Sequence, residues 1–600
     1  MAARLQRLRR EGPGEVFLFA GPAFRRAAPW LFAAILLAGL ITRLHPAVRY
    51  GVWGSDSGEY LFLTKQLAET GRVSFPYDGW GLAYPYFPGM FVLSGAVHAI
   101  TGVDVFYATQ WTTPIVASLT GVLVGLIAYR VTSDPRAGVL SGAFVAVCGG
   151  IVITTSHPMP GALGQVFVLG LLALVPDMYR DRWNVVLLAV LGVALVLTHH
   201  LSTYFAIGAL AFIPFYREMT QRHSDAHRLR VEIPVVGAFL ALALVWWLAV
   251  AKPFRDEIVG DALPFNPWIT AFLFLAALAS LPALVMLRRA RSPWHLNPRY
   301  PNFRRQRAYI LGGFFGFLGV LLILVFVRLP GTNIELGWPT IVYAIPLVAW
   351  LSFLPLGLAS VRFHRHGSML VAWLYAILGS LAFAIATNSH VLFPFRHVDY
   401  MLEAMAPLLA VGMLMWYDQA LSERLPSDRP RVRANFMVGI AALLLVSSVL
   451  SLPPRETLGG FEEGMTRAEL EGVRWAGDHL PRDSTIAADH RLSSLLFGLA
   501  HLAPTWDYAP DTYHSDDPIV ALRELSSAHV PSKGEHVRVD HVMVTPGIEE
   551  GVTLLQWENS APMTEAAIVK FEDARYFETL YDENDVRIYR VKWESVGTLV

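Results

Sequence analysis

The 600-residue sequence has a single cysteine and a low share of charged residues. One cysteine, Cys148, cannot form a disulfide within the chain, so cysteine usage does not indicate the redox compartment. Charged residues make up 16% of the sequence, whereas a soluble protein carries about a quarter. With 48 basic and 48 acidic residues there is no positive excess, and no nucleic-acid-binding motif is present, so we expect no nucleic-acid partner.

The sequence is rich in apolar residues. Apolar residues make up 54% of the chain and the mean hydropathy is +0.43. Basic residues before the first apolar run, with no clean cleavage site after it, predict a retained signal anchor. Because a helix needs about 17–25 apolar residues to cross a bilayer, about thirteen spans are predicted. They lie near residues 28–46, 105–129, 137–155, 161–178, 183–199, 201–216, 233–251, 267–287, 308–327, 338–361, 368–387, 398–417 and 435–453.

The arginines of the loops predict the orientation of the chain. If the N-terminus is cytoplasmic and the apolar segment 84–102 does not cross, nearly all loop arginines fall on the cytoplasmic side. Since short cytoplasmic loops carry the excess of Lys and Arg, we predict a multi-pass cell-membrane protein with that orientation. The segment 84–102 is then an interfacial helix on the outer leaflet, and everything after Leu452 is extracytoplasmic.

The predicted fold class is an α-helical polytopic membrane protein with a C-terminal soluble α/β domain. The membrane domain covers residues 1–453, with an outer first loop at 47–104, and the soluble domain covers 454–600. Thr466 and Glu469 form a capping-box pattern that predicts a helix running to about Leu480. β-rich runs predict strands near 484–488, 539–544 and 586–591.

Two carboxylates in the first outer loop are the candidates for catalysis. Asp56 and Glu59 are three residues apart, so they fall on one face at the start of a helix predicted to stop at Gly71. Such a pair at a membrane surface can supply a general base or bind a divalent cation such as Mg²⁺ or Mn²⁺. The structural alternative is a capping box, with Asp56 as N-cap and Glu59 as its partner. The local sequence is compatible with both a catalytic pair and a capping box.

Polar residues at the predicted outer ends of spans are candidates for substrate binding. Ionisable groups at membrane depth are costly, so each is a functional hypothesis by default. A guanidinium also suits phosphate recognition. Near an interface, however, long side chains snorkel to water, so each residue alone also has a structural explanation. No spacing specifies a metal site, and the cofactor stays open. The candidates are Arg396, Tyr400, Arg255, Lys252, His157 and His200.

Several short motifs follow one another in a recognisable layout. The first outer loop carries G-x-D-x-x-x-Y at Gly54, Asp56 and Tyr60, and the outer segment YPYFPGMFVLSGAVHAITG follows it. Arg396 and Tyr400 open a late span, and a soluble outer tail ends the chain. This layout resembles the GT-C superfamily of integral membrane glycosyltransferases, notably the branches related to oligosaccharyltransferases and to aminoarabinose or mannosyl transferases.

The resemblance implies a function and roles for particular residues. It implies that a sugar is transferred, with inversion, from a polyprenyl-phosphate-linked donor to an acceptor on the outer face of the membrane. The acceptor would be a lipid, a glycan or a protein, and the enzyme would also contact membrane lipids. By position, Asp56 is similar to the family's first-loop catalytic carboxylate, with Glu59 as a second, and Arg396 is a candidate for the lipid phosphate.

The sequence also departs from the oligosaccharyltransferase pattern. The stretch SHPMPGALGQ lacks the carboxylates found in a later outer loop of those enzymes, which weakens metal dependence and protein N-glycosylation. Their W-W-D-Y-G signature is matched at three of five positions by TWDYA, residues 505–509, which lies later than expected. The expected place is occupied by IAADHRLSS, residues 486–494, which lacks the signature.

The leading hypothesis is therefore a membrane glycosyltransferase of the hexosyl or pentosyl class. The alternative is a transporter or flippase for a lipid-linked or polymer precursor. Transporters concentrate ionisable residues at the bilayer midplane, whereas the polar groups here gather at the outer ends of the spans, which favours surface chemistry.

Overall fold

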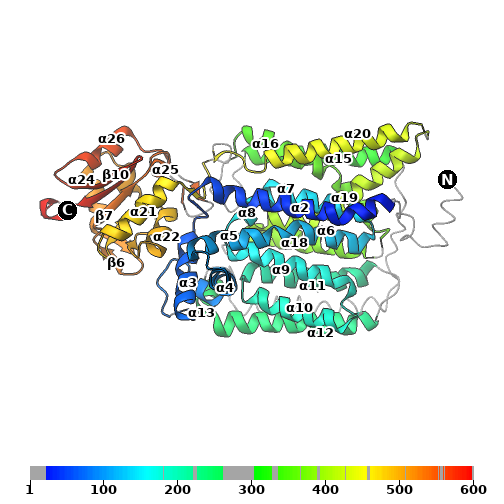
Figure 1. Ribbon diagram of the computed structural model, residues 1–600, viewed down its shortest axis with the longest axis horizontal. Helices are drawn as coiled ribbons and strands as arrows, with labels where there is room; N and C mark the ends of the chain where they lie inside the picture. Colours follow the sequence, from blue (N-terminus) through cyan, green and yellow to red (C-terminus); the bar gives the residue numbers. More distant parts are fainter. Residues whose placement is uncertain are drawn as a thin grey trace.

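The structure is a computed structural model of the chain. It describes residues 22–73, 75–179, 181–220, 226–260, 303–326, 336–364, 366–387, 392–425, 427–455, 460–506, 509–551, 553–554, 558–559 and 561–596. Figure 1 shows a bundle of roughly parallel helices, with the segment after residue 460 forming a separate unit at one end.

The bundle has the helices expected of a multi-pass membrane protein. Within the described ranges, nine helices are long and apolar enough to cross a bilayer, and the pair α7 and α8, bent by 62°, would make a tenth. The nine are α2 (Pro22–Arg49), α5 with α6 (Val105–Ala117, Leu119–Thr132), α9 with η2 (Pro160–Leu174, Val175–Asp177), α12 with η3 (Ala226–Val245, Trp246–Val250), α15 (Phe303–Phe326), α16 with α17 (Pro339–Leu351, Leu354–Val361), α18 (Gly367–Thr387), α19 (Arg396–Ser422) and α20 (Arg429–Val449).

The predicted spans coincide with helices wherever the structure describes the chain. The bent pair α7 (Pro135–Val147) and α8 (Gly149–Ser156) occupies the span predicted at 137–155. Two predicted spans fall on α10 (Arg182–Val196), which has only 15 residues, and on α11 (His200–Thr220). The span predicted at 267–287 lies outside the described residues. The fold class is confirmed.

The helix α19 lies at the centre of the bundle. In the apolar stretch of α19, 89% of the residues are buried inside the protein, compared with 6% in α15 and 11% in α12 and α20. The apolar side chains of α15, α12 and α20 therefore face the surface of the bundle, where lipid would contact them. Glycines bring α6 and α7 into close contact: a Cβ on Gly125 would lie 2.6 Å from the Gly138 carbonyl oxygen. Small residues of this kind allow helix backbones to approach within a membrane.

The first loop forms ordered structure at one end of the bundle. It contains β1 (Val52–Trp53), α3 (Ser57–Thr70), η1 (Tyr84–Tyr86) and α4 (Gly89–Thr101). The predicted stop is confirmed, because Gly71 adopts a left-handed conformation (φ 71°) and its N–H donates to the Leu67 carbonyl. At 13 residues α4 is about 20 Å long, too short to cross the hydrocarbon core. Figure 1 shows it nearly end-on among helices that run across the view.

The C-terminal unit is built on a five-stranded mixed sheet in the order β10-β11-β7-β3-β4. Its central strand β7 pairs in parallel with β3 and antiparallel with β11. The predicted strands and the Thr466–Glu469 capping box are confirmed. The elements are β2 (Gly464–Met465), α21 (Arg467–His479), β3 (Thr485–Ala487), α22 (His490–Gly498), β4 (Ala503–Pro504), α23 (Pro510–His514), α24 (Pro518–Ser526), β5 (Ala528–Val530), β6 (Gly534–Val537), β7 (His541–Val544), α25 (Pro546–Glu549), β8 (Thr553–Leu554), β9 (Glu558–Asn559), α26 (Glu565–Val569), η5 (Lys570–Glu572), β10 (Phe577–Glu583), β11 (Val586–Val591) and α27 (Trp593–Val596).

A seam joins the first loop to the C-terminal unit. The strand β1 pairs antiparallel with β2, with Val52 opposite Met465. The helices α3 and α22 cross at glycines so closely that a Cβ on Gly498 would lie 1.9 Å from the Gly58 carbonyl oxygen. Two backbone N–H groups at the start of α3, those of Gly58 and Glu59, donate to the Ser494 hydroxyl at 3.0 and 3.2 Å. We use "the seam" below for these α3–α22 and β1–β2 contacts.

The close crossing gives a stability prediction. Gly498→Ala should destabilise the protein by about 1–3 kcal/mol, because the added methyl group meets backbone that cannot move without separating α3 from α22. The matched control is Gly95→Ala in α4, where an added Cβ meets nothing within 4 Å. Thermal unfolding of the purified protein in detergent measures both. Equal midpoints for the two variants would contradict the close crossing.

Candidate functional site

Asp56 lies where the first loop, the bundle and the C-terminal unit meet. Its side chain keeps 24% exposure. The Tyr84 hydroxyl donates to Asp56 Oδ2 at 2.8 Å, and the Tyr60 hydroxyl donates to the same oxygen at 3.3 Å. On the other side, His490 Nε2 of α22 lies 3.5 Å from Asp56 Oδ1. Both carboxylate oxygens are thus held while part of the group remains open to a ligand.

These neighbours keep Asp56 ionised. Burial by itself would raise the pKa of Asp56, but the hydrogen bond and charge of His490, the Tyr84 hydroxyl and the charge of Arg396 together hold it below its ordinary value. An ionised carboxylate that retains access to solvent can accept a proton from a bound nucleophile.

The capping-box alternative for Asp56 and Glu59 is wrong. Asp56 occupies the N-cap position of α3, but its side chain makes no capping hydrogen bond. The Ser494 hydroxyl accepts from the first-turn N–H groups instead, across the seam. The Asp56 carboxylate is therefore left for contacts outside its own helix.

Glu59 has a different environment from Asp56. It is fully buried (0% exposed), and its Oε1 accepts from the Tyr77 hydroxyl at 2.6 Å and from the Gly81 N–H at 3.0 Å. Burial, together with the negative charge of Asp56, raises the pKa of Glu59 to about 7. These contacts tie the loop at 77–81 to α3, so the structure places Glu59 beneath the site, in contact with the loop backbone.

The C-terminal unit contributes an aromatic ring next to Trp80 and His490. Trp506 is fully buried, and its ring centroid lies 6.4 Å from Trp80 of the first loop and 6.1 Å from His490. Trp506 has a φ of 59°, in the left-handed region that bulky residues rarely adopt. Such backbone strain is concentrated at functional sites.

Sequence reasoning did not single out His490 or Trp506 as site residues. His490 belongs to IAADHRLSS and Trp506 to TWDYA, and the structure brings these two stretches together at the site although 16 positions separate the two residues. Asp507 and Tyr508 of TWDYA lie outside the described residues. The position of IAADHRLSS after the first helix of the unit was a sequence signal for a site residue in this stretch. The residue types in the stretch gave no chemical reason to choose the histidine.

Arg396 and His157 lie on the bundle side of the site. Arg396 begins α19, and its Nη1 lies 3.7 Å from Met159 Sδ. Its positive charge acts on Asp56 and on His157. The His157 ring stacks on Trp53 of β1 with 4.9 Å between centroids. Arg396 is thus a cation whose charge acts on the carboxylate, and His157 packs against Trp53 of the first loop.

The remaining substrate-binding candidates belong to α11, α13 and α19. Tyr400 is 3% exposed, and its hydroxyl hydrogen-bonds with the Ser202 hydroxyl at 2.5 Å inside the bundle. His200 packs against Phe254 of α13 (Lys252–Gly260), with ring centroids 4.2 Å apart. Arg255 pairs with Asp256 at 2.6 Å on the surface, and Lys252 is exposed at the start of the same helix. In Figure 1 α13 lies at the same end of the bundle as α3 and α4.

The described residues offer no ligand set for a divalent cation. No group of three or more His, Cys, Asp or Glu side chains within the described ranges is arranged to hold a metal ion. Around Asp56 the partners are two tyrosine hydroxyls and an imidazole. These groups hold the carboxylate itself.

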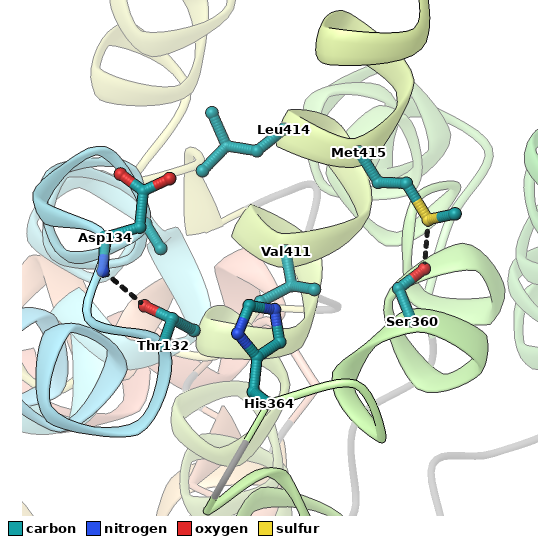
Figure 2. Close-up of a pocket in the computed structure, with 8 residues that line it drawn as sticks. Thr132, Asp134, Ser360, His364, Val411, Leu414 and Met415 are labelled. Carbon is teal, nitrogen blue, oxygen red and sulfur yellow. Dashed lines mark hydrogen bonds between the residues drawn. The ribbon is translucent and has the colours of Figure 1, made fainter. Parts of the chain in front are cut away.

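Two cavities differ in whether they can hold a substrate. Figure 2 shows a cavity of about 10 Å³ between Asp134, His364 and Met415, at the end of the bundle away from Asp56. That volume is about enough for one water molecule. A groove of about 450 Å³ lies instead between the end of α2, the start of α5 and α21. Its lining includes Tyr50 and Gly51, which directly precede β1, so larger ligands have room on this side of the protein.

The fold is similar to that of solved archaeal oligosaccharyltransferases. The apo enzyme of Archaeoglobus fulgidus matches with a TM-score of 0.59 at 14% identity, over 94% of this chain and 80% of that chain. AglB of Archaeoglobus fulgidus, in complex with an inhibitory peptide and a dolichol-phosphate, matches with a TM-score of 0.54 at 14% identity, over 86% and 69%. The Archaeoglobus fulgidus enzyme tethered with an acceptor peptide containing the NVT sequon matches with a TM-score of 0.51 at 14% identity, over 94% and 74%.

These similarities define the class of fold. No protein-family profile and no curated protein sequence matches the chain. The chain has a GT-C-like fold, as the layout of its motifs and spans predicted, and it is a multi-pass membrane protein.

The buried carboxylate gives a pH prediction. A carboxyl whose pKa rises from 4.5 to about 7 on folding binds more protons in the folded state, so stability should fall as pH rises across that interval. Glu59→Gln should remove this slope, with a difference from wild type of up to about 3 kcal/mol between pH 4.5 and pH 8. Unfolding in detergent across this pH range measures it. Glu69→Gln, an exposed glutamate on the same helix, should keep the wild-type slope. A slope unchanged in Glu59→Gln would contradict the burial of Glu59.

Proposed function

We propose that this protein is a glycosyltransferase that moves a sugar from a polyprenyl-phosphate-linked donor to an acceptor, with Asp56 as the catalytic base. The observation that carries the proposal is the ionised, partly exposed carboxylate of Asp56, held at the seam and facing the charge of Arg396. The GT-C-like fold supports it, since AglB of that fold has been solved with a dolichol-phosphate.

The reaction needs a base and a cation, and the site supplies both. The acceptor hydroxyl or amide would lose its proton to Asp56 as it attacks the anomeric carbon. The donor phosphate would leave with the bonding electrons, and Arg396 would stabilise its negative charge. A guanidinium suits this role because it binds phosphate through paired N–H donors.

The same residues favour a single displacement with inversion. A retaining reaction requires a second carboxylate that attacks the sugar and forms a covalent intermediate. Glu59, the neighbouring carboxylate, is fully buried and accepts hydrogen bonds from Tyr77 and Gly81. Direct attack by the acceptor requires only Asp56.

We also propose the orientation, in which the site faces the outside. The first loop and the C-terminal unit share one end of the bundle through the seam, so both face one compartment. The excess of arginine in the opposite loops favours the cytoplasm for the other end.

Asp56→Asn tests the chemical proposal. Loss of the base should lower the rate of sugar transfer by about 10²–10⁴-fold, because asparagine keeps the shape of the side chain but cannot take the proton. Purified protein supplied with polyprenyl-phosphate sugars and candidate acceptors measures the rate. Asp78→Asn, an exposed carboxylate in the same loop, is the control and should keep wild-type activity. A folded Asp56→Asn protein as active as wild type would refute Asp56 as the base.

The single cysteine makes the orientation simple to test. Cys148 is buried, and Cys148→Ala gives a background without cysteine. Arg72→Cys in the first loop and Glu471→Cys in the C-terminal unit should react with a membrane-impermeant maleimide in intact cells. Glu423→Cys, exposed near the end of α19, should react only after permeabilisation. If Arg72→Cys and Glu471→Cys were labelled from opposite sides of the membrane, the proposed orientation would be wrong.

A further inference from the structure

The histidine at the start of α22 contacts the proposed base from outside the membrane domain. His490 is 3% exposed, and its Nε2 lies 3.5 Å from Asp56 Oδ1, on the opposite side of the carboxylate from the Tyr84 hydroxyl. In sequence, 434 positions separate the two residues, so only the closure of the C-terminal unit on the first loop brings them together.

The position of His490 is fixed by buried groups on both sides of it in the chain. Asp489 caps α22 by accepting from the Leu492 N–H at 2.9 Å. Arg491 is 1% exposed, donates to Asp489 Oδ2 at 2.7 Å, and donates to the Gly464 carbonyl of β2 at 2.7 Å. These bonds link the first turn of α22 to β2, and β2 pairs with β1 four residues before Asp56. The imidazole therefore has little freedom to turn away from the carboxylate.

The same ring is also confined by its neighbours. Trp80 packs on it edge-on with centroids 5.1 Å apart, and His490 Nδ1 lies 3.3 Å from the Trp506 carbonyl oxygen. Because a carbonyl oxygen can only accept, Nδ1 of His490 carries the hydrogen in this contact. The other ring nitrogen, Nε2, points toward Asp56. Protonated at both nitrogens, the ring would donate to both oxygens.

We infer that His490 is a positioning residue for sugar transfer, which orients the Asp56 carboxylate from the side opposite Tyr84, so that the C-terminal unit completes the site on the first loop. This inference rests on the proposed function for its catalytic readout. By this inference the C-terminal unit takes part in the chemical step, in addition to any contact that it makes with the acceptor.

Other charged and titratable groups also face Asp56, and the test must separate His490 from them. They come from every element around the carboxylate and are Glu59 and Tyr60 of α3, Tyr77 of the following loop, Tyr84 of η1, His157 before α9 and Arg396 of α19. All of these remain in a protein changed only at His490.

His490→Gln tests the inference, since glutamine keeps a hydrogen-bond donor and loses the charge. We expect kcat to fall about ten- to a hundredfold with little change in KM for the donor. The acid limb of the pH profile of kcat/KM should move to higher pH, because removal of the imidazole raises the pKa of the Asp56 carboxyl. His479→Gln, an exposed histidine of the same unit, should leave both unchanged.

Gly472→Ala distinguishes positioning from a purely structural role. An added Cβ at Gly472 would lie 2.7 Å from Val586 Cγ1 inside the C-terminal unit, so this variant should lower the melting temperature without moving the acid limb. The inference is overturned if His490→Gln keeps the wild-type kcat and acid limb, or if it lowers stability and rate as Gly472→Ala does with no displacement in pH.

A measurement without substrate separates this inference from the proposed function. The ¹³C shift of the Asp56 carboxyl, assigned with Asp56→Asn in protein labelled at aspartate, reports its titration directly. A higher pKa in His490→Gln, in a protein that transfers no sugar, would support the pairing and refute glycosyl transfer. An unchanged titration in a protein that does transfer sugar would refute the pairing and leave the proposed function standing.

Discussion

The site depends on the contact between α3 and α22, where two glycines bring helix backbones together. Gly58 and Gly498 allow an approach that any side chain would prevent, and Ser494 accepts hydrogen bonds from the buried N–H groups at the start of α3. Because the Ser494 hydroxyl satisfies these donors, the carboxylate at the N-cap position is released from capping. Asp56 can then contact Tyr84 and His490, which together keep it ionised.

Two carboxylates three residues apart acquire opposite properties from this arrangement. Asp56 keeps access to solvent and positive charge around it, so its pKa is low. Glu59 points into the protein, where burial and the charge of Asp56 raise its pKa to about 7. A pair of neighbouring acids with pKa values pushed apart is a common arrangement at sites of proton transfer. Here the second acid holds the loop at 77–81, which also carries Trp80 to the site.

The interior of the bundle contains more charge than the sequence analysis allowed when it favoured an enzyme over a transporter. Arg43 and Glu403 are both fully buried within spans, and Arg217 pairs with the buried Glu232. Asp134, Arg136 and Asp418 form an ion-pair cluster at the other end of the bundle. The proposal of an enzyme therefore rests on the groups gathered around Asp56, at the end where the C-terminal unit closes.

Local patterns in the sequence were enough to predict the membrane class, the helices at the predicted spans that the structure describes, the stop at Gly71, the capping box at Thr466 and the strands of the C-terminal unit. Each of these could be predicted because hydrophobic length, helix caps and alternation act within about twenty residues. The layout of motifs and spans along the chain also indicated the GT-C-like fold. Other features could not be predicted in this way: the Asp56 side chain makes no capping bond, Glu59 is buried, Tyr400 is enclosed in the bundle, and His490 and Trp506 reach the site. Those properties depend on contacts between segments that lie hundreds of residues apart, and no local pattern records which distant backbone will supply a missing hydrogen bond or charge.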